Sequence, residues 1–176
     1  MKEKFRKDLR LPGYDYAQQG SYFVTVCTNF KQDLLIKKSN KRVVAGFHAC
    51  QEPFYELTEI GGEVEKTLQY IHEHYDGVSV DKYCIMPNHV HILFSLQAPE
   101  SETGRHGSLP LRDVVGRLKS YTTKQYRSII NQPKAILWQR NYYEHVIRND
   151  EDYAEKWRYI DENPHRRRLL KHKIGS

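Results

Sequence analysis

The stretch VSVDKYCIMPNHVHILFSL, from Val78 to Leu96, carries the strongest structural signal in the sequence. Two apolar runs, Val78–Met86 and His89–Leu96, flank the turn-prone pair Pro87–Asn88. Short apolar runs bounded by a turn are typical of buried strands. We predict two neighbouring strands joined by that turn, with one bulged continuous strand as the alternative.

The other regular elements follow from composition and periodicity. Ser21–Thr28 (SYFVTVCT) is rich in aromatic and β-branched residues, which indicates a strand. Apolar residues at helical spacing predict a first helix that begins near Ile60 and ends near Gly77. A second helix follows Pro110, and Leu137–Ile147 is interpreted as a further strand. The apolar stripe of this second helix is predicted to contain Leu111, Val115, Leu118, Thr122 and Ile129.

A last helix is predicted from Asn149, a good N-cap residue that precedes an acidic first turn. Pro164 is expected to end this helix, because proline disfavours helical geometry at the residue before it. Residues 40–57 are ambiguous and are interpreted as an irregular hairpin. The polar segment 97–109 is expected to be a loop.

The order of these elements is strand, helix, two strands, helix, strand and helix. This order predicts an α+β protein with a ferredoxin-like sandwich, in which helices pack on an antiparallel sheet. A length of 176 residues suits one domain. We therefore expect a single domain over residues 1–176, with basic extensions at 1–12 and 165–176.

Composition limits the class and the compartment. Hydrophobic residues make up 39% and charged residues 28% of the chain, a globular balance rather than a disordered one. No apolar run approaches the ~20 residues of a membrane span, and no signal core follows the basic start. The three cysteines form no Cys-x-x-Cys pair, which argues against a disulfide framework or a thiolate zinc site. We expect a cytoplasmic protein with no membrane partner.

The distribution of charge indicates a nucleic-acid partner. The net charge is +6, and basic residues crowd both ends of the chain and the second predicted helix. Phosphate backbones attract such clusters through counterion release. Solubility is the alternative explanation for the same charges.

The triplet His89-Val90-His91 suggests a metal site. Residues two apart in a strand point to the same face, so both imidazoles project together while Val90 turns toward the core. Two neighbouring imidazoles form a partial site for a divalent metal ion. Two histidines on a solvated sheet face are the alternative, although an otherwise strongly apolar strand is an unusual place for them.

The tyrosines can be compared by their positions on the predicted helices. At ~100° per residue, one side of the last helix gathers its apolar residues. That predicted buried stripe consists of Tyr153, Ala154, Trp157 and Ile160. Tyr159 lies roughly 130° from the centre of the stripe, which disfavours a core role, and Asn163 follows one turn later. Tyr121 and Tyr126 lie nearer the apolar stripe of their own helix and fit packing better.

Two blocks resemble a known family. MPNHVHILF (Met86–Phe94) is similar to the histidine–hydrophobic–histidine (HUH) motif of the single-tyrosine transposases, which include the REP-associated tyrosine transposases and related insertion-sequence enzymes. LWQRNYYEHVIRNDEDYAEKWRYIDENP (Leu137–Pro164) resembles their C-terminal block. The resemblance covers roughly residues 14–164 and is firm only in these two blocks. Together the blocks are specific, whereas a single His-x-His would not be.

This resemblance implies roles for individual residues. Tyr159 matches the nucleophile on the C-terminal helix, and His89 and His91 match two metal ligands. Asn163 stands where the family has a third ligand, with Asp161 and Glu162 as alternatives. The implied cofactor is Mg²⁺ or Mn²⁺, and the implied reaction is metal-dependent cleavage and rejoining of single-stranded, hairpin-associated DNA through a covalent 5′-phosphotyrosine.

Candidate DNA contacts are basic residues and one aromatic residue. Their side chains suit a phosphate track with base stacking. The candidates are Arg112, Arg117, Lys119, Lys124, Arg140 and Tyr143, and the family resemblance alone adds Arg6 and Arg10. Trp138 is expected in the core, and the sequence assigns no role to Glu144 or His145.

Two other functions remain open from the sequence. One is a domesticated protein that binds hairpin DNA without transposing it. The other is a metal-dependent phosphodiesterase that uses water as its nucleophile. The target sequence and the choice between monomer and homodimer are not determined.

Overall fold

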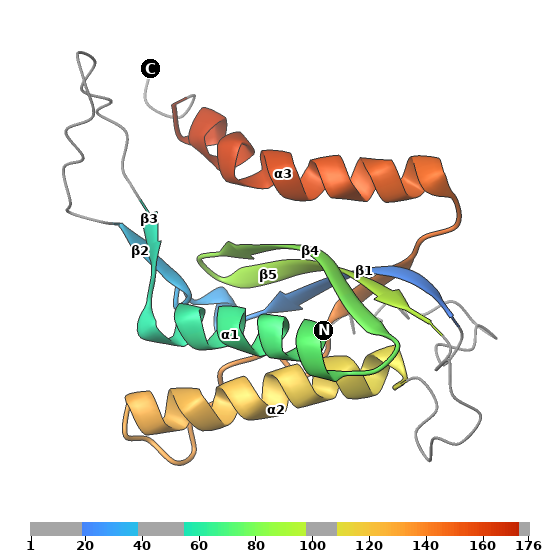
Figure 1. Ribbon diagram of the computed structural model, residues 1–176. Helices are drawn as coiled ribbons and strands as arrows, with labels where there is room; N and C mark the ends of the chain where they lie inside the picture. Colours follow the sequence, from blue (N-terminus) through green and yellow to red (C-terminus); the bar gives the residue numbers. More distant parts are fainter. Residues whose placement is uncertain (1–18, 39–54, 98–108, 173–176) are drawn as a thin grey trace, which may run out of the picture.

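The structure is a computed structural model that describes residues 19–38, 55–97 and 109–172, with side chains described up to residue 163. The predicted extension 1–12 lies outside these residues, as do most of the expected hairpin 40–57 and most of the polar segment 97–109. The described residues form a four-stranded sheet with helices on both faces (Figure 1).

The sheet has the order β4-β5-β1-β6, and every neighbouring pair is antiparallel. Its strands are β1 (Gly20–Cys27), β4 (Val78–Met86), β5 (His89–Leu96) and β6 (Tyr143–Val146). Two helices connect them along the chain, α1 (Glu59–His74) before β4 and α2 (Leu111–Ile129) before β6. Strand–helix–strand–strand–helix–strand in this sheet order is the ferredoxin-like arrangement, which confirms the predicted fold class. The predicted separate strands β4 and β5 are also confirmed.

Smaller elements extend this framework. A short 3-10 helix, η1 (Asn29–Lys31), follows β1. The strands β2 (Ile36–Lys38) and β3 (Tyr55–Leu57) pair antiparallel in a separate two-stranded sheet. They lie at or just outside the two ends of the segment that the sequence left ambiguous. A third helix, α3 (Asp150–His172), follows β6.

The two faces of the sheet carry cores of very different size. On the α1 and α2 face, side chains such as Val24, Ile92 and Phe94 join the helices in one large buried cluster. On the opposite face, beneath α3, the buried cluster consists of Phe23, Leu93 and Ile160 (Figure 1). Alternation along β5 sends residues 90, 92 and 94 to the first face and residues 91 and 93 to the second. The candidate site lies on this second face.

The start of α1 is held against the chain before it. Thr58 caps the helix by accepting a hydrogen bond from the Gly61 N–H at 3.1 Å. Its own hydroxyl reaches the carbonyl oxygen of Leu34 at 2.7 Å, and the backbone N–H of Thr58 donates to the oxygen of Leu35 at 3.0 Å. These bonds fix Leu35 directly above Gly61.

Gly61→Ala is expected to destabilise the fold by about 1–3 kcal/mol, because overpacking against immobile atoms carries that cost. A β-carbon at Gly61 would overlap the backbone oxygen of Leu35. Gly62→Ala is the matched control, since a β-carbon there meets no atom within 4 Å, and it should be stabilising by up to about 1 kcal/mol. Urea denaturation of both variants tests this, and equal effects would contradict the packing argument.

The predicted strand Leu137–Ile147 is wrong in its first half. Regular pairing is confined to β6, and Trp138 makes only an isolated bridge with Thr28. The Trp138 indole N–H donates instead to Thr122 at 2.8 Å, so the side chain is anchored to α2. Lys119 Nζ donates hydrogen bonds to the carbonyl oxygens of Gln139 and Arg140 at 2.7 and 2.8 Å. Backbone pairing here is limited to two hydrogen bonds, from Asn29 to Leu137 and from Gln139 to Cys27, and contacts to α2 hold the rest of the segment. Trp138 is buried as expected.

The expected helix end at Pro164 is also wrong, because α3 continues to His172. A proline inside a helix removes one backbone donor and disfavours helical geometry before it, and long helices tolerate this as a bend. Figure 1 shows α3 bending toward its C-terminal end. In the described part of the chain, no helix is both long and apolar enough to cross a membrane.

Candidate active site

His89 and His91 project together from β5 onto the α3 face. Their Nε2 atoms lie 3.1 Å apart, and the rings meet edge to face with centroids 4.6 Å apart. The two imidazoles therefore share one face, as strand periodicity predicted, and their Nε2 atoms converge on one point. His91 is buried, whereas His89 is partly exposed.

The turn between β4 and β5 sets the orientation of His89. The Asn88 amide nitrogen donates to Asp33 Oδ1 at 2.9 Å, which directs Asn88 Oδ1 toward His89. That oxygen lies 2.7 Å from His89 Nδ1 and can only accept a hydrogen bond. Nδ1 must therefore carry a proton, which leaves Nε2 as the lone-pair atom of the neutral ring. This is the tautomer that a metal ligand requires, fixed by a side chain outside the ligand set.

His91 is held from the other side. Its Nδ1 lies 2.8 Å from Thr25 Oγ1, and its ring stacks on Phe23 with centroids 5.3 Å apart. Burial, reinforced by the nearby His89, lowers the pKa of His91 to about 3. The imidazole is therefore neutral over the physiological range and keeps a lone pair for a ligand. Since a hydroxyl can donate or accept, Thr25 suits either tautomer of His91.

Tyr159 lies against His91. Their ring centroids are 5.2 Å apart, and the Tyr159 ring also meets Phe23 edge to face at 5.7 Å. The predicted buried stripe of α3 is wrong, because Ala154 and Trp157 are exposed and Ile160 alone of the four is fully buried. The side facing the sheet carries Tyr159 next to Ile160, so Tyr159 does not point away from the sheet. The predicted rotation of α3 is wrong, although Tyr159, the tyrosine that it singled out, lies at the histidine pair.

Asn163 lies one helical turn after Tyr159. Its side chain is partly buried, and its Nδ2 atom is buried with no hydrogen-bond partner among the described residues. Asp161, an alternative ligand from the sequence, is instead bound to Lys82 at 2.5 Å. Glu162 is exposed.

These residues fit a divalent metal ion. Two ligands at right angles, each ~2.1 Å from an ion, lie about 3.0 Å apart, close to the separation of the two Nε2 atoms. Within the described ranges, no group of three His, Cys, Asp or Glu side chains could hold a metal. A third protein ligand near the pair would then have to be another donor type, such as the Asn163 amide oxygen. The donor set would be two imidazoles with one oxygen, leaving positions open.

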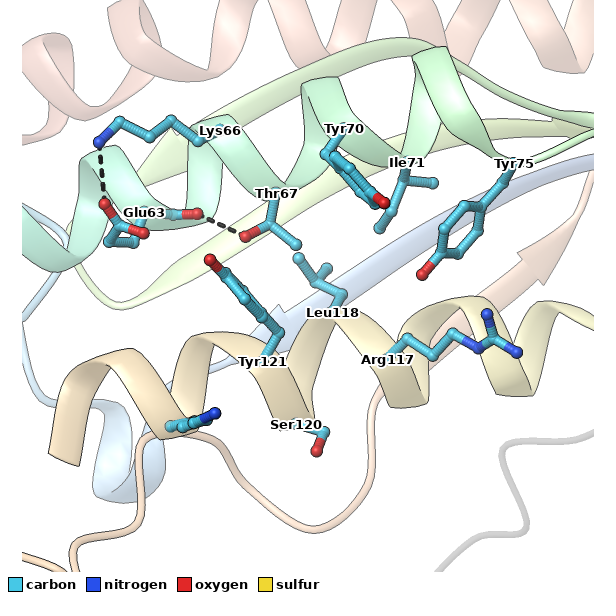
Figure 2. A pocket seen from close by; sticks show the side chains of 11 residues that line it. Glu63, Lys66, Thr67, Tyr70, Ile71, Tyr75, Arg117, Leu118, Ser120 and Tyr121 are labelled. Atoms are coloured by element: carbon cyan, nitrogen blue, oxygen red, sulfur yellow. Dashed lines mark hydrogen bonds and ion pairs between the residues drawn. The ribbon is translucent and has the colours of Figure 1, made fainter. Parts of the chain in front are cut away.

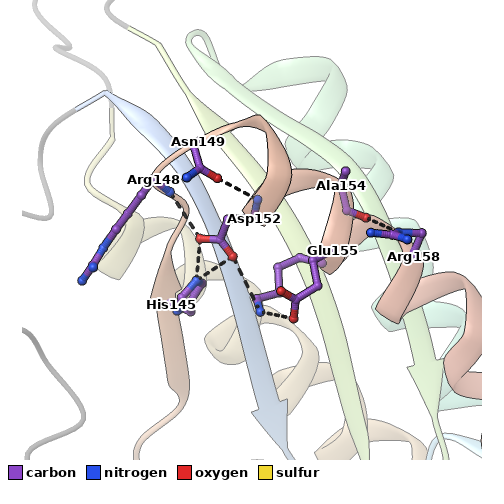
Figure 3. Close-up of polar contacts among 8 residues, drawn as sticks. His145, Arg148, Asn149, Asp152, Ala154, Glu155 and Arg158 are labelled. Atoms are coloured by element: carbon purple, nitrogen blue, oxygen red, sulfur yellow. Dashed lines mark hydrogen bonds and ion pairs between the residues drawn. The ribbon is translucent and has the colours of Figure 1, made fainter.

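The N-terminal turn of α3 is fixed to β6 by polar contacts (Figure 3). The Asp152 N–H donates to Asn149 Oδ1 at 2.8 Å, which confirms the predicted N-cap. The Asp152 carboxylate lies 2.8 Å from His145 Nε2 and 3.6 Å from Lys156 Nζ. His145, to which the sequence assigned no role, therefore ties β6 to the helix that carries Tyr159. Glu144 is buried on the same strand.

Comparison with known proteins places the chain in a family. A model of the family described as "Transposase IS200 like" matches residues 17–163. The chain belongs to the IS200-like transposase family. An uncharacterised Haemophilus influenzae protein is 29% identical over 172 residues, covering 90% of this chain and 88% of that protein. A second Haemophilus influenzae protein, named as a REP-associated tyrosine transposase, is 31% identical over 116 residues, 61% of each chain.

A solved structure shares the fold of this transposase. It is a REP-associated tyrosine transposase bound to a REP hairpin, with a TM-score of 0.50 and 16% identity. The match covers 90% of this chain and 74% of that one. The predicted resemblance to this group of transposases is thus confirmed.

The candidate DNA contacts of the transposase fall into three groups. Arg6 and Arg10 lie outside the described residues. Lys119 is half-buried and binds two backbone carbonyl oxygens, and burial lowers its pKa, so its ammonium group already serves the fold. The remaining candidates are all exposed, and they are Arg112, Arg117, Lys124, Arg140 and Tyr143.

A groove of about 720 Å³ runs between α1 and α2, on the sheet face away from the histidines (Figure 2). Tyrosine rings from both helices line it, and Tyr70 and Tyr121 are about half-exposed. Arg117 lies over the Tyr75 ring at 5.3 Å, and Lys124 completes the basic side. Tyr121 was predicted to lie nearer the apolar stripe of its helix and to serve packing, and this is wrong, because its ring is about half-exposed and lines this groove. Only the packing of α1 on α2 creates the groove, so no sequence pattern indicated it.

Proposed function

We propose that this transposase cuts and rejoins single-stranded DNA with Tyr159 as its nucleophile and a divalent metal ion as its cofactor. The observation that supports this most strongly is the contact of the Tyr159 ring with His91, whose Nε2 converges with that of His89. One phenol beside two oriented imidazoles is a set suited to metal-assisted phosphoryl transfer.

The proposed reaction is a phosphoryl transfer to Tyr159. The Tyr159 phenol gives up its proton, and its oxygen forms a bond to the scissile phosphorus. The bond between phosphorus and the 3′-oxygen breaks, and that oxygen takes up a proton to leave as a 3′-hydroxyl. The strand stays attached as a 5′-phosphotyrosine, so attack by another 3′-hydroxyl reverses the step and joins strands.

His89, His91 and Asn163 would hold Mg²⁺ or Mn²⁺. When bound there, such an ion supplies Lewis-acid polarisation of the scissile phosphate and offsets charge in the transition state. The protein's own contribution is orientation. Asn88 and Thr25 fix the two imidazoles, and Phe23 holds the Tyr159 ring beside them. A positioned nucleophile avoids the entropy of a bimolecular encounter.

The proposed substrate is a single strand flanked by a hairpin. The solved relative with a bound hairpin supports this for the family fold. On this chain, Arg117 and Lys124 make no ion pair among the described residues and flank exposed tyrosine rings, an arrangement that suits phosphates with stacked bases. Arg112, Arg140 and Tyr143 would extend the contact surface.

The deciding experiment is incubation of the protein with end-labelled hairpin-bearing single-stranded DNA and Mn²⁺, followed by denaturing electrophoresis. We expect a labelled band at the mass of the protein plus the strand, which protease treatment removes. Tight binding without the band would favour a domesticated hairpin-binding protein. Free 5′-phosphate product without the band would favour water as the nucleophile, and either result would overturn the proposal.

A further inference from the structure

The helix that carries Tyr159 is attached to the sheet mainly by polar groups. Of the described α3 side chains, Ile160 alone is fully buried. The apolar contact of α3 with the sheet is small, because Ile160 packs on Phe23 and Leu93 with only the partly buried Tyr153 and Tyr159 beside it on the helix. So small a cluster restricts sliding and rotation of the helix only weakly. The contacts from α3 to β4 are instead hydrogen bonds, an ion pair and a cation–π contact, and two consecutive β4 residues receive them.

A β-bulge in β4 brings these two residues to one face. The register pairs Val80 with Phe94 and then Lys82 with Leu93, which leaves Asp81 as the extra residue. Neighbouring residues in a regular strand face opposite sides, whereas a bulge re-aims a side chain. Asp81 and Lys82 consequently both contact α3. We call them the bulge pair.

Asp81 forms the first attachment. The Tyr153 hydroxyl donates to Asp81 Oδ2 at 3.1 Å. Ser95 donates to the same oxygen at 2.5 Å, and Ser79 donates to Oδ1 at 2.6 Å, so the carboxylate is rigidly held. Burial and the charge of Asp81 raise the pKa of Tyr153 to about 12, which keeps the hydroxyl protonated as a donor. The first turn of α3 is thereby fixed to the sheet.

Lys82 forms the second attachment, close to the candidate nucleophile. Its Nζ atom lies 2.5 Å from Asp161 Oδ1 and 4.2 Å from the centroid of the Trp157 ring. Asp161 is two residues after Tyr159 and two before Asn163, on the turn that connects them. Contacts on both sides of Tyr159 along the helix restrict rotation as well as sliding.

We propose that the bulge pair positions α3, so that Tyr159 and Asn163 face His89 and His91. This inference rests on the proposed function of Tyr159. An exposed ion pair contributes little to stability, and Asp161 is largely exposed. We expect the Lys82–Asp161 ion pair to act by positioning α3, because a displacement of ~1 Å in a reacting group can cost about 10²-fold in rate.

The test is the single-turnover rate of covalent adduct formation in Lys82→Ala and in Asp161→Ala. We expect each rate to fall about 10- to 100-fold while hairpin affinity changes less than about 2-fold. Lys82→Arg should retain most of the rate, and the charge swap Lys82→Glu with Asp161→Lys should recover part of it. Lys37→Ala, which breaks an exposed ion pair with Glu56 on the small sheet, is the matched control and should leave the rate unchanged.

Amide hydrogen exchange over residues 150–163 and the fluorescence of Trp157 report the placement of α3 without any DNA. Both should change in Lys82→Ala and recover in Lys82→Arg. A normal adduct rate in Lys82→Ala, or a loss explained by weaker hairpin binding, would overturn the positioning role. If the unaltered protein forms no adduct, the proposed function fails. In that case, unchanged hydrogen exchange in Lys82→Ala would show that the bulge pair does not position α3 either. Altered exchange would show that the bulge pair still fixes α3 to the sheet.

Discussion

Tyr159→Phe should form no covalent adduct with DNA, a loss of at least about 10⁴-fold in the rate of strand cleavage. The substitution removes the only atom of the side chain that can bond to phosphorus. The contacts of Tyr159 with His91 and Phe23 are ring contacts, and phenylalanine keeps them. We therefore expect the fold and the affinity for hairpin DNA to be retained.

The measurement pairs denaturing electrophoresis of the labelled adduct with fluorescence anisotropy of the same oligonucleotide. Tyr55→Phe is a suitable control, because Tyr55 is an exposed tyrosine on β3, in the separate two-stranded sheet. It should cut at the normal rate. Cleavage by Tyr159→Phe at a rate near that of the unaltered protein would show that another group attacks the phosphate.

The histidine pair and its strand were predictable from sequence because they depend on local periodicity. The β4 and β5 bounds follow the two apolar runs on either side of Pro87–Asn88. Alternation along β5 then placed His89 and His91 on one face without any knowledge of the partner strands. Local periodicity does not give the order of the strands in the sheet, because that order depends on how the helices cross it.

The orientation of α3 was not predictable in this way. Hydrophobic periodicity locates a helix face only when apolar burial determines the packing, and α3 packs largely through polar side chains. Its most prominent apolar residue, Trp157, is exposed and packs against the ammonium group of Lys82. The bulge that supplies Lys82 leaves no mark in the sequence, since Asp81 and Lys82 look like an ordinary polar interruption of a strand.

Contacts between distant segments explain the other site features that the sequence did not predict. Asp33 orients Asn88 across 55 positions, and through it His89, which no local pattern could indicate. Lys119 resembled a DNA contact because it stands among basic residues on α2. Folding instead places it beneath two carbonyl oxygens of the following segment. Charge clusters indicate the class of partner, and the fold decides which charges reach it.

His89→Ala should abolish metal-dependent cleavage and remove the stabilisation that metal binding confers. We expect the cleavage rate to fall by about 10²–10³-fold or more, the scale of losing a main source of transition-state charge stabilisation. For the unaltered protein, Mn²⁺ at about 100 times its Kd should stabilise the fold by about 2.7 kcal/mol, a rise of about 5–10 °C in Tm. His89→Ala should show almost none of that rise.

His89 is a better target than His91 for this test, because the two imidazoles differ in what else they support. His91 is buried, stacks on Phe23 and bonds to Thr25, so His91→Ala would leave a cavity and confuse lost metal with lost packing. His89 is partly exposed, and its removal leaves the core intact. His74→Ala, at an exposed histidine on α1, controls for general loss of a metal-binding imidazole.

Melting curves with and without Mn²⁺, together with calorimetric titration of the metal, separate binding from chemistry. Chelation should stop cleavage by the unaltered protein, and added Mn²⁺ should restore it. If His89→Ala with His91→Ala still cuts at the normal rate in the presence of chelator, the metal site is wrong. Loss of cleavage with Mn²⁺ binding unchanged would instead mean that the ion binds elsewhere and that the histidine pair acts directly on the phosphate.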